Sequence, residues 1–248
     1  MIVSNLVAIH QPNFFPWLGY FAKIARADRF VVLDHVQFPK TKGNWGNRTR
    51  LLIGGKPRFF TMPIRRDYHG VRAFHEMLAS EQAAWREDLL KTLRTHYARS
   101  QHFAEVFSVV EPIILNPHEN LAEYNFSALR ALAPRLGIDA NKFVLSSPIA
   151  PATQATEMLV DLIRAVGGDG YLCGGGSADY LEPARFAEAG VELVFQSYRH
   201  PVYPQVGAGE FAPGLSCLDA LLNCGFDAVA SWLDASARHE IPAEKNAA

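Results

Sequence analysis

The sequence predicts an α/β fold: a Rossmann-like parallel sheet with a β-hairpin and an α-helical insertion. Short apolar runs that end at a polar residue alternate with amphipathic stretches, which is typical of parallel strands joined by helices. The first strand, helix and strand fall within about 30 residues, the length of a βαβ unit. Ligands bind such sheets outside the carboxyl ends of the strands, so polar residues at those ends are candidate site residues.

The first βαβ unit begins the chain. Residues 6–9 form an apolar run that stops at His10 and the following Gln-Pro, which indicates a buried strand. Residues 18–27 predict a short helix, and residues 29–33, rich in Phe and Val, predict a second strand that ends at Asp34. We therefore expect His10 and Asp34 at the same edge of the sheet.

The insertion follows, and the α/β pattern then resumes. Residues 49–53 and 58–63 are β-like runs separated by Gly-Gly-Lys-Pro, which predicts a hairpin. Apolar residues at helical spacing predict helices over residues 82–98, 103–115 and 121–136. The later elements are strands over 142–145, 170–173 and 191–195, a helix from an N-cap at Thr153 to about 166, a short helix ending at 186–189, and helices near 217–223 and 226–233.

Length and composition bound the class of protein. The 248 residues predict one α/β domain over residues 1–234, with the insertion at about 40–140, and a flexible C-terminal tail over 235–248. The 24 Lys and Arg nearly balance 25 Asp and Glu, which argues against a nucleic-acid partner. No apolar run approaches the ~20 residues of a membrane span. Three Cys without metal-ligand spacing predict a reducing, cytoplasmic location and no metal site.

The neutral total conceals a basic insertion. Residues 40–72 contain nine Lys and Arg against Asp67 alone, a local net charge of +8. One interpretation is a cap over a phosphorylated small molecule, and the other is a solvated hairpin.

Polar residues gather first between the expected first strand and first helix. His10 suits a general base or a phosphate donor, because its charge changes near neutral pH. The alternative is a hydrogen-bonded turn histidine among core aromatics. The candidate substrate-binding residues of this segment are Gln11, Asn13, Trp17, Gly19 and Tyr20.

A second group follows the second strand. Asp34 at a strand end suits three roles: orienting a base, holding a metal or binding a ribose hydroxyl. The alternative is that Asp34 caps a turn. Asn47 and Arg48 suit a polar fork for phosphate or carboxylate, and Gln37 lies between.

Two further groups follow later strands. Gly174 and Gly175, with Tyr180, form a glycine-rich loop that permits close approach of a ligand or a phosphate nest. Cys173, before this loop, is interpreted as a small buried residue. The last group reads as a rigid recognition loop and consists of His200, Tyr203, Gln205 and Asp219, although Asp219 also suits the first turn of a helix.

These segments together resemble the WbqC-like protein family, over nearly the whole chain up to about Gly225. The resemblance is carried by His10–Asn13 with residues 16–21, by residues 30–34 with Gln37, by residues 171–174 with 180–181, and by residues 200–205 with 215–219 and 223–225. It implies modification of an activated sugar in the synthesis of O-antigen and other surface glycans, by transfer of an amino-acid or acyl group.

A weaker resemblance concerns the fold of the nucleotidyltransferase superfamily, whose signature is His-x-Gly-His. Residues 17–20 keep the glycine and replace both histidines by Trp17 and Tyr20, which puts nucleotidyl transfer in doubt unless His10 takes over their role.

Three functions remain open from the sequence. The first is a transferase or ligase that acts on a nucleotide-activated sugar, with His10 as the base and Asp34 as its partner. The second is an adenylate-forming or nucleotidyl-transfer enzyme that uses ATP with Mg²⁺. The third is a non-catalytic nucleotide-sugar binding module. All three expect a phosphorylated or nucleotide-linked small molecule as the partner, and the sequence assigns neither a cofactor nor an oligomeric state.

Overall fold

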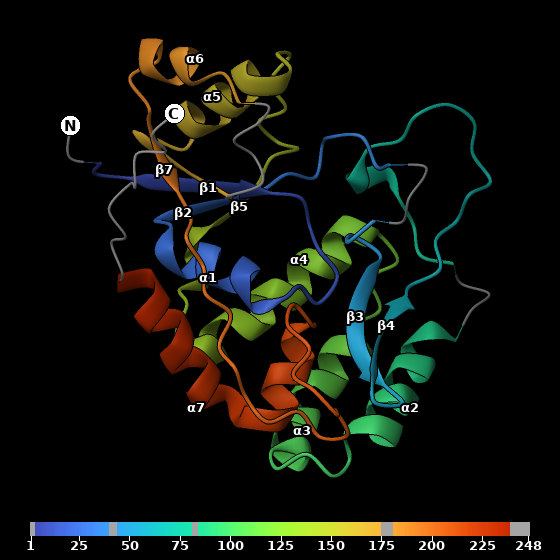
Figure 1. Cartoon of the computed structure of the whole chain (residues 1–248). Helices are drawn as coiled ribbons and strands as arrows, with labels where there is room; N and C mark the ends of the chain where they lie inside the picture. Colours follow the sequence, from blue (N-terminus) through green and yellow to red (C-terminus); the bar gives the residue numbers. More distant parts are fainter. Residues whose placement is uncertain (1–2, 40–43, 81–83, 175–180, 239–248) are drawn as a thin grey trace.

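The computed structural model describes residues 3–39, 44–80, 84–174 and 181–238. Its centre is a five-stranded parallel sheet in the order β5-β2-β1-β6-β7 (Figure 1). The chain moves outward from β1 to β2 and β5, and then crosses to the other side of β1 for β6 and β7. The predicted α/β fold class is confirmed. The strands are β1 (Leu6–His10), β2 (Arg29–Val32), β5 (Phe143–Leu145), β6 (Gly170–Cys173) and β7 (Glu192–Phe195).

Helices cover both faces of the sheet. Figure 1 shows α5 (Ala155–Ala165) and α6 (Pro183–Glu188) above it, and α1 (Leu18–Arg26) and α7 (Cys217–Arg238) below. Neighbouring side chains along a strand point to opposite faces. Val7 and Ile9 of β1 pack with the α5 side, whereas Ala8 belongs to the core around α1 and α7. His10 follows the same alternation as Ala8, so its ring lies on the α1 side.

The insertion packs into the core on the α1 side. The hairpin of β3 (Arg48–Ile53) and β4 (Lys56–Thr61) turns through two glycines with positive φ, as a tight two-residue turn requires. Leu51 and Leu52 of β3 share one buried cluster with residues of α1 and α7. The helices of the insertion are α2 (Trp85–Tyr97), α3 (Phe103–Ile114) and α4 (Leu121–Leu132), with 3₁₀ turns at Phe74–Glu76, Ala133–Leu136 and Ala140–Lys142.

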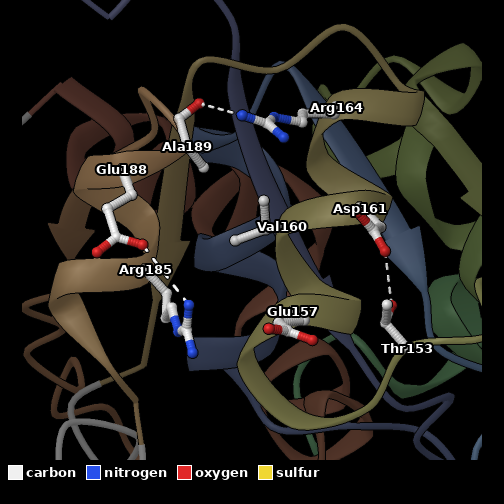
Figure 2. Close-up of a pocket in the computed structure, with 8 residues that line it drawn as sticks. All are labelled: Thr153, Glu157, Val160, Asp161, Arg164, Arg185, Glu188 and Ala189. Atoms are coloured by element: carbon white, nitrogen blue, oxygen red, sulfur yellow. Dashed lines mark hydrogen bonds and ion pairs between the residues drawn. The ribbon is translucent and has the colours of Figure 1, made fainter.

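Three local differences from the expected elements have physical reasons. The third insertion helix changes to a 3₁₀ turn at Ala133, because Pro134 has no N–H to continue the α-helical bonds. Thr153 is not the N-cap of α5: Gln154 occupies that position, and the Thr153 hydroxyl donates to Asp161 instead (Figure 2). The tail was expected from residue 235, but α7 continues through Arg238; residues 239–248 lie outside the described part of the chain.

The two C-terminal helices expected from the sequence are present as the two halves of α7. Gly225, with φ 82° and ψ 171°, bends the chain between them. Two features disfavour any side chain at this position. The backbone is left-handed, and a Cβ atom would collide with the ring of His102. Within the described residues, no helix is long and apolar enough to cross a membrane.

Candidate active site at the carboxyl edge of the sheet

His10 ends β1, and two contacts hold its ring in place. Its Nδ1 lies 3.1 Å from the carbonyl oxygen of Gln11, so Nδ1 carries the proton and donates it to that oxygen. The hydroxyl of Tyr20 donates to the same carbonyl at 3.0 Å, and the two rings meet edge to face at 4.7 Å. Nε2 is therefore the basic nitrogen, and no described residue hydrogen-bonds to it.

The surroundings keep His10 neutral. Burial, and then the positive charge of Lys23, lower its pKa from 6.5 to about 4. At pH 7 the imidazole therefore carries a free lone pair on Nε2 and accepts a proton or a hydrogen bond.

Lys23, in the middle of α1, is a functional candidate that sequence reasoning missed. Its side chain is only 5% exposed, and its Nζ donates to the carbonyl oxygen of Ile9 at 3.0 Å. Burial lowers its pKa to about 8. A signal was available in the sequence, because the rest of this short helix is almost wholly apolar and offers no polar face for a solvated lysine.

The end of β6 lies beside the end of β1. Cys173 is fully buried, and its thiol donates to the carbonyl of Val194 at 3.4 Å, which agrees with a small core residue. A Cβ atom built on Gly174 would meet no heavy atom of the described residues within 4 Å, so those residues leave space on this side of Gly174. Gly175 and Tyr180, both predicted to bind substrate, lie outside the described residues.

Asp34 ends up in a buried network with Ser146, and no described hydrogen bond joins it to His10. Its side chain is 2% exposed, and Oδ1 accepts from the Ser146 hydroxyl and the Ser147 amide, both at 2.8 Å. The Ser146 hydroxyl donates its hydrogen bond to Asp34. Its oxygen therefore accepts a hydrogen bond from Nδ1 of His35 at 2.7 Å. This order is the reverse of a nucleophilic triad, in which the histidine accepts from the serine.

The loop between β1 and α1 is mostly built into the protein core. Asn13 and Phe15 are buried, and Phe15 adopts φ 39°. Its carbonyl accepts from the hydroxyls of Thr49 and Ser216, each at 2.8 Å. These bonds tie the loop to the hairpin and to the start of α7, and so fix where His10 points.

Trp17 is the exposed residue of this loop, at 40% exposure. Its indole lies over the backbone of Gly19, where even a Cβ atom would collide with it. The Gly19 carbonyl accepts from the Gln196 side chain at 2.9 Å, which joins α1 to the segment after β7. Tyr198 and His200 of that segment pack on the indole, with ring centroids at 5.4 and 6.4 Å.

The second group of predicted residues does not converge on a single point. The Asn47 side chain is buried and donates to the Met62 carbonyl at 2.9 Å. Arg48 stacks its guanidinium 4.1 Å from the centroid of the Phe59 ring, next to exposed Trp45. No described hydrogen bond joins Asn47 and Arg48 into a fork. Gln37 is exposed and pairs through its backbone with Ala73.

The last group forms a satisfied network around Asp219, which is fully buried in the first turn of α7. It accepts from the hydroxyls of Tyr97 at 2.9 Å and Tyr203 at 2.8 Å, and from the Gln205 amide at 3.0 Å. Burial raises the pKa of Asp219, and these donors oppose the shift. The network fastens the loop after β7 to α7 and α2. His200 packs over Tyr203, but its buried Nε2 has no hydrogen-bond partner in the described part of the chain.

A shallow groove between α5 and α6 lies on the other face of the sheet (Figure 2). Arg185 pairs with Glu188 at 3.6 Å, and Arg164 donates to the Ala189 carbonyl at 2.8 Å. The two arginines of this groove are therefore already engaged with other residues that line it. Within the described residues, no group of three or more His, Cys, Asp or Glu is placed to hold a metal.

The fold and the strand-end cluster define an α/β protein of Rossmann-like topology, with a candidate site where the strand order reverses. The chain belongs to the WbqC-like protein family, whose family model matches residues 11–231. That family is associated with polysaccharide biosynthesis in general. An uncharacterized protein of Mycobacterium tuberculosis is 31% identical over 224 residues, which span 90% of this chain and 95% of that protein. No solved structure matches.

Proposed function

We propose that the protein is a transferase or ligase that attaches an amino-acid or acyl group to a nucleotide-activated sugar in O-antigen-like surface-polysaccharide biosynthesis. One observation carries the proposal: a neutral histidine of fixed orientation, His10, ends the central strand, and no described residue hydrogen-bonds to its Nε2. Ligands of open α/β sheets bind outside the carboxyl ends of the strands, where the strand order reverses. Membership of the WbqC-like family supports the substrate class.

The arrangement suits general base catalysis of acyl transfer. A sugar amine or hydroxyl loses a proton as it bonds to the acyl carbon, and Nε2 of His10 takes that proton. The bond from Nδ1 to the Gln11 carbonyl holds the ring while the proton moves. His10 then returns the proton to the group that leaves the acyl carbon. Asp34 acts at a distance in this proposal, because it orders the segment after β5 through Ser146 and Ser147.

The test is product formation. Purified protein is incubated with a panel of nucleotide sugars and with activated amino-acid and acyl donors, and the sugar is analysed by mass spectrometry. We expect a mass gain that corresponds to one transferred group. His10→Ala should reduce its rate by about 10²–10⁴-fold, the usual contribution of a general base. The matched control is His69→Ala, at an exposed position of the insertion, which should leave the rate unchanged.

Three results would contradict the proposal in different ways. Full activity of His10→Ala would show that His10 is not the general base. Exchange of pyrophosphate with ATP in the absence of any sugar favours the nucleotidyl-transfer alternative. Tight binding of a nucleotide sugar, unchanged by every donor, favours the binding module.

A further inference from the structure

The strands β1 and β6 separate before either of them ends. Their pairing runs from Leu6 with Gly170 to Ala8 with Leu172 and then stops. In contrast, β1 stays paired with β2 up to His10, and β6 stays paired with β7 up to Cys173. Ile9 and Cys173 would form the next pair between β1 and β6. The sheet therefore opens at this point, between its two central strands.

The ammonium group of Lys23 lies at this opening. It donates to the carbonyl of Ile9, the first residue of β1 beyond the last pair with β6. From there it lies 5.8 Å from the centroid of the Tyr171 ring, on β6. The lysine thus reaches from α1 to the point where the pairing of β1 with β6 ends.

Lys23 has far fewer partners than a buried cation needs. An ammonium group has three N–H donors, and one acceptor, the Ile9 carbonyl, is recorded for it. Among the described residues, no carboxylate forms an ion pair with it. A buried charge without a counter-charge costs several kcal/mol, so proteins keep one where a ligand supplies the opposite charge or where the proton leaves.

Lys142, a half-buried lysine in the 3₁₀ turn before β5, shows what a saturated ammonium group against the same helix looks like. Its ammonium group contacts the carbonyls of Ile24, Ala25 and Ala27 at 3.2, 3.4 and 2.6 Å. Those bonds close the C-terminal end of α1. Lys23 closes no helix end, so a capping role does not account for it.

We infer that the ammonium group of Lys23 is the counter-charge for a phosphate group of a nucleoside diphosphate, bound where β1 and β6 separate. The inference takes the nucleotide part of the ligand from the proposed function, whereas the anion site itself stands on the strand geometry. Phosphate is the anion that suits the position, because ligands of this fold place their phosphates at the carboxyl edge, where the strand order reverses.

A phosphate at Lys23 also changes His10. The charge of Lys23 is one of the causes that keep the pKa of His10 low. A bound anion offsets that charge, so the pKa of His10 rises and its Nε2 becomes a stronger base. Substrate binding and base strength are then coupled.

The first test compares two lysine-to-methionine variants. Binding of UDP, and separately of inorganic sulfate, is measured by calorimetry and by the rise in melting temperature. Lys23→Met should weaken UDP by roughly thirtyfold or more, the effect of removing one member of a buried charge pair. Lys142→Met should melt at a lower temperature but bind both anions as the wild type does. Unchanged binding by Lys23→Met, or no binding of either anion by the wild type, overturns the inference.

A second measurement uses the wild type alone, in case Lys23→Met does not fold. Sulfate keeps its charge between pH 6 and 10, so a change in affinity reports on the protein. Because the pKa of Lys23 is about 8, sulfate affinity should fall about tenfold per pH unit above that value. The titratable groups that surround Lys23 are His10, Tyr20, Tyr171 and Cys173. Cys173→Ala should keep the same profile, and a flat profile in the wild type contradicts the inference.

The result is separable from that of the proposed function. Anion binding that depends on Lys23, without any transfer to a sugar, supports the anion site and contradicts the proposed transfer reaction. Transfer to a sugar by a Lys23→Met variant with unchanged KM supports the transfer reaction and contradicts the anion site at Lys23. NMR titration of His10 adds a third readout: its pKa should rise when sulfate binds to the wild type and should not respond to sulfate in Lys23→Met.

Discussion

Two polar clusters of this protein follow parallel strands of one sheet, and they differ in how many of their hydrogen-bonding groups are used. Around Asp219, two tyrosine hydroxyls and an amide all donate to one carboxylate. At the ends of β1 and β6, no described residue hydrogen-bonds to Nε2 of His10, and Lys23 has one acceptor in the described part of the chain. The carboxylate of the first cluster is fully hydrogen-bonded, whereas the ammonium group of the second lacks a counter-charge among the described residues.

The difference teaches how to separate a scaffold from a site. Both clusters look alike as sequence, with His, Gln and Tyr among prolines and aromatics. A completed network holds segments together, so its removal should cost stability. An incomplete cluster carries unfavourable burial that a ligand relieves, so its removal should cost binding or turnover and leave stability unchanged or improved.

The sharpest way to break the comparison is to remove the acceptor of the completed network. Asp219→Ala leaves the buried hydroxyls of Tyr97 and Tyr203 without their acceptor, whereas the Gln205 amide keeps the Ala212 carbonyl, and we expect a loss of about 3–5 kcal/mol in the free energy of unfolding. Lys23→Met should cost nothing, or should stabilise by about 1–4 kcal/mol, as replacement of a buried charge by an apolar side chain often does. Urea unfolding measures both. Equal losses in the two variants would show that the clusters are of one kind.

The second prediction uses pH. The pKa of His10 is lowered in the folded protein, so the folded state binds this proton less readily than the unfolded chain does. The stabilising contribution of neutral His10 is therefore present above pH 6.5 and is lost as the pH falls to about 4. By pH 4 the wild type should have lost about 2–3 kcal/mol relative to His10→Gln. Parallel pH profiles of unfolding for the two proteins would contradict the low pKa.

A third prediction strains the completed region at the bend of α7. Gly225→Ala introduces a side chain at φ 82° and against the ring of His102, and should cost about 1–3 kcal/mol. The double variant Gly225→Ala, His102→Ala removes the collision and keeps the backbone strain. It should recover part of the loss relative to His102→Ala alone, as measured by urea unfolding. No loss in the single variant would mean that α7 continues without the bend.

The smallest expected effect comes from a matched pair of tyrosines. Tyr203→Phe removes a hydroxyl that donates to Asp219, and should cost about 1–2 kcal/mol. Tyr198→Phe removes a buried hydroxyl that has no hydrogen-bond partner among the described residues, so it should be neutral or slightly stabilising in thermal melts. A destabilised Tyr198→Phe would show that this hydroxyl has a partner in solution.

Much of the fold was predictable because its signals are local. The apolar run before His10, the Gly-Gly turn of the hairpin and the helical spacing of Leu89, Leu90 and Leu93 each depend on a few neighbouring residues. The N-cap of α5 was wrong for the opposite reason. Thr153 has a hydroxyl of the kind that caps helices, but this hydroxyl donates to Asp161, which lies 8 residues further along the chain.

The candidate site was predictable only in part, because partners distant in sequence decide what a polar residue does. The position of His10 at the end of a strand was predicted correctly. The partners of Asp34, such as Ser146, come from beyond the insertion, and nothing near Asp34 in the sequence announces them. Lys23 was overlooked because a lysine in a short helix is usually solvated, although the apolar composition of the rest of α1 indicated that this side chain is buried.

The backbone of Phe15 sets an order on the assembly of the site. Its left-handed conformation is held by hydroxyls from Thr49 and from Ser216, which lies 201 residues further along the chain. A nascent chain that has not yet released Ser216 from the ribosome lacks one of these two anchors. The first strand of the protein is therefore made early, but the loop that aims its histidine is completed among the last contacts. The loop that orients His10 therefore gains its second anchor only when the start of the C-terminal helix is in place.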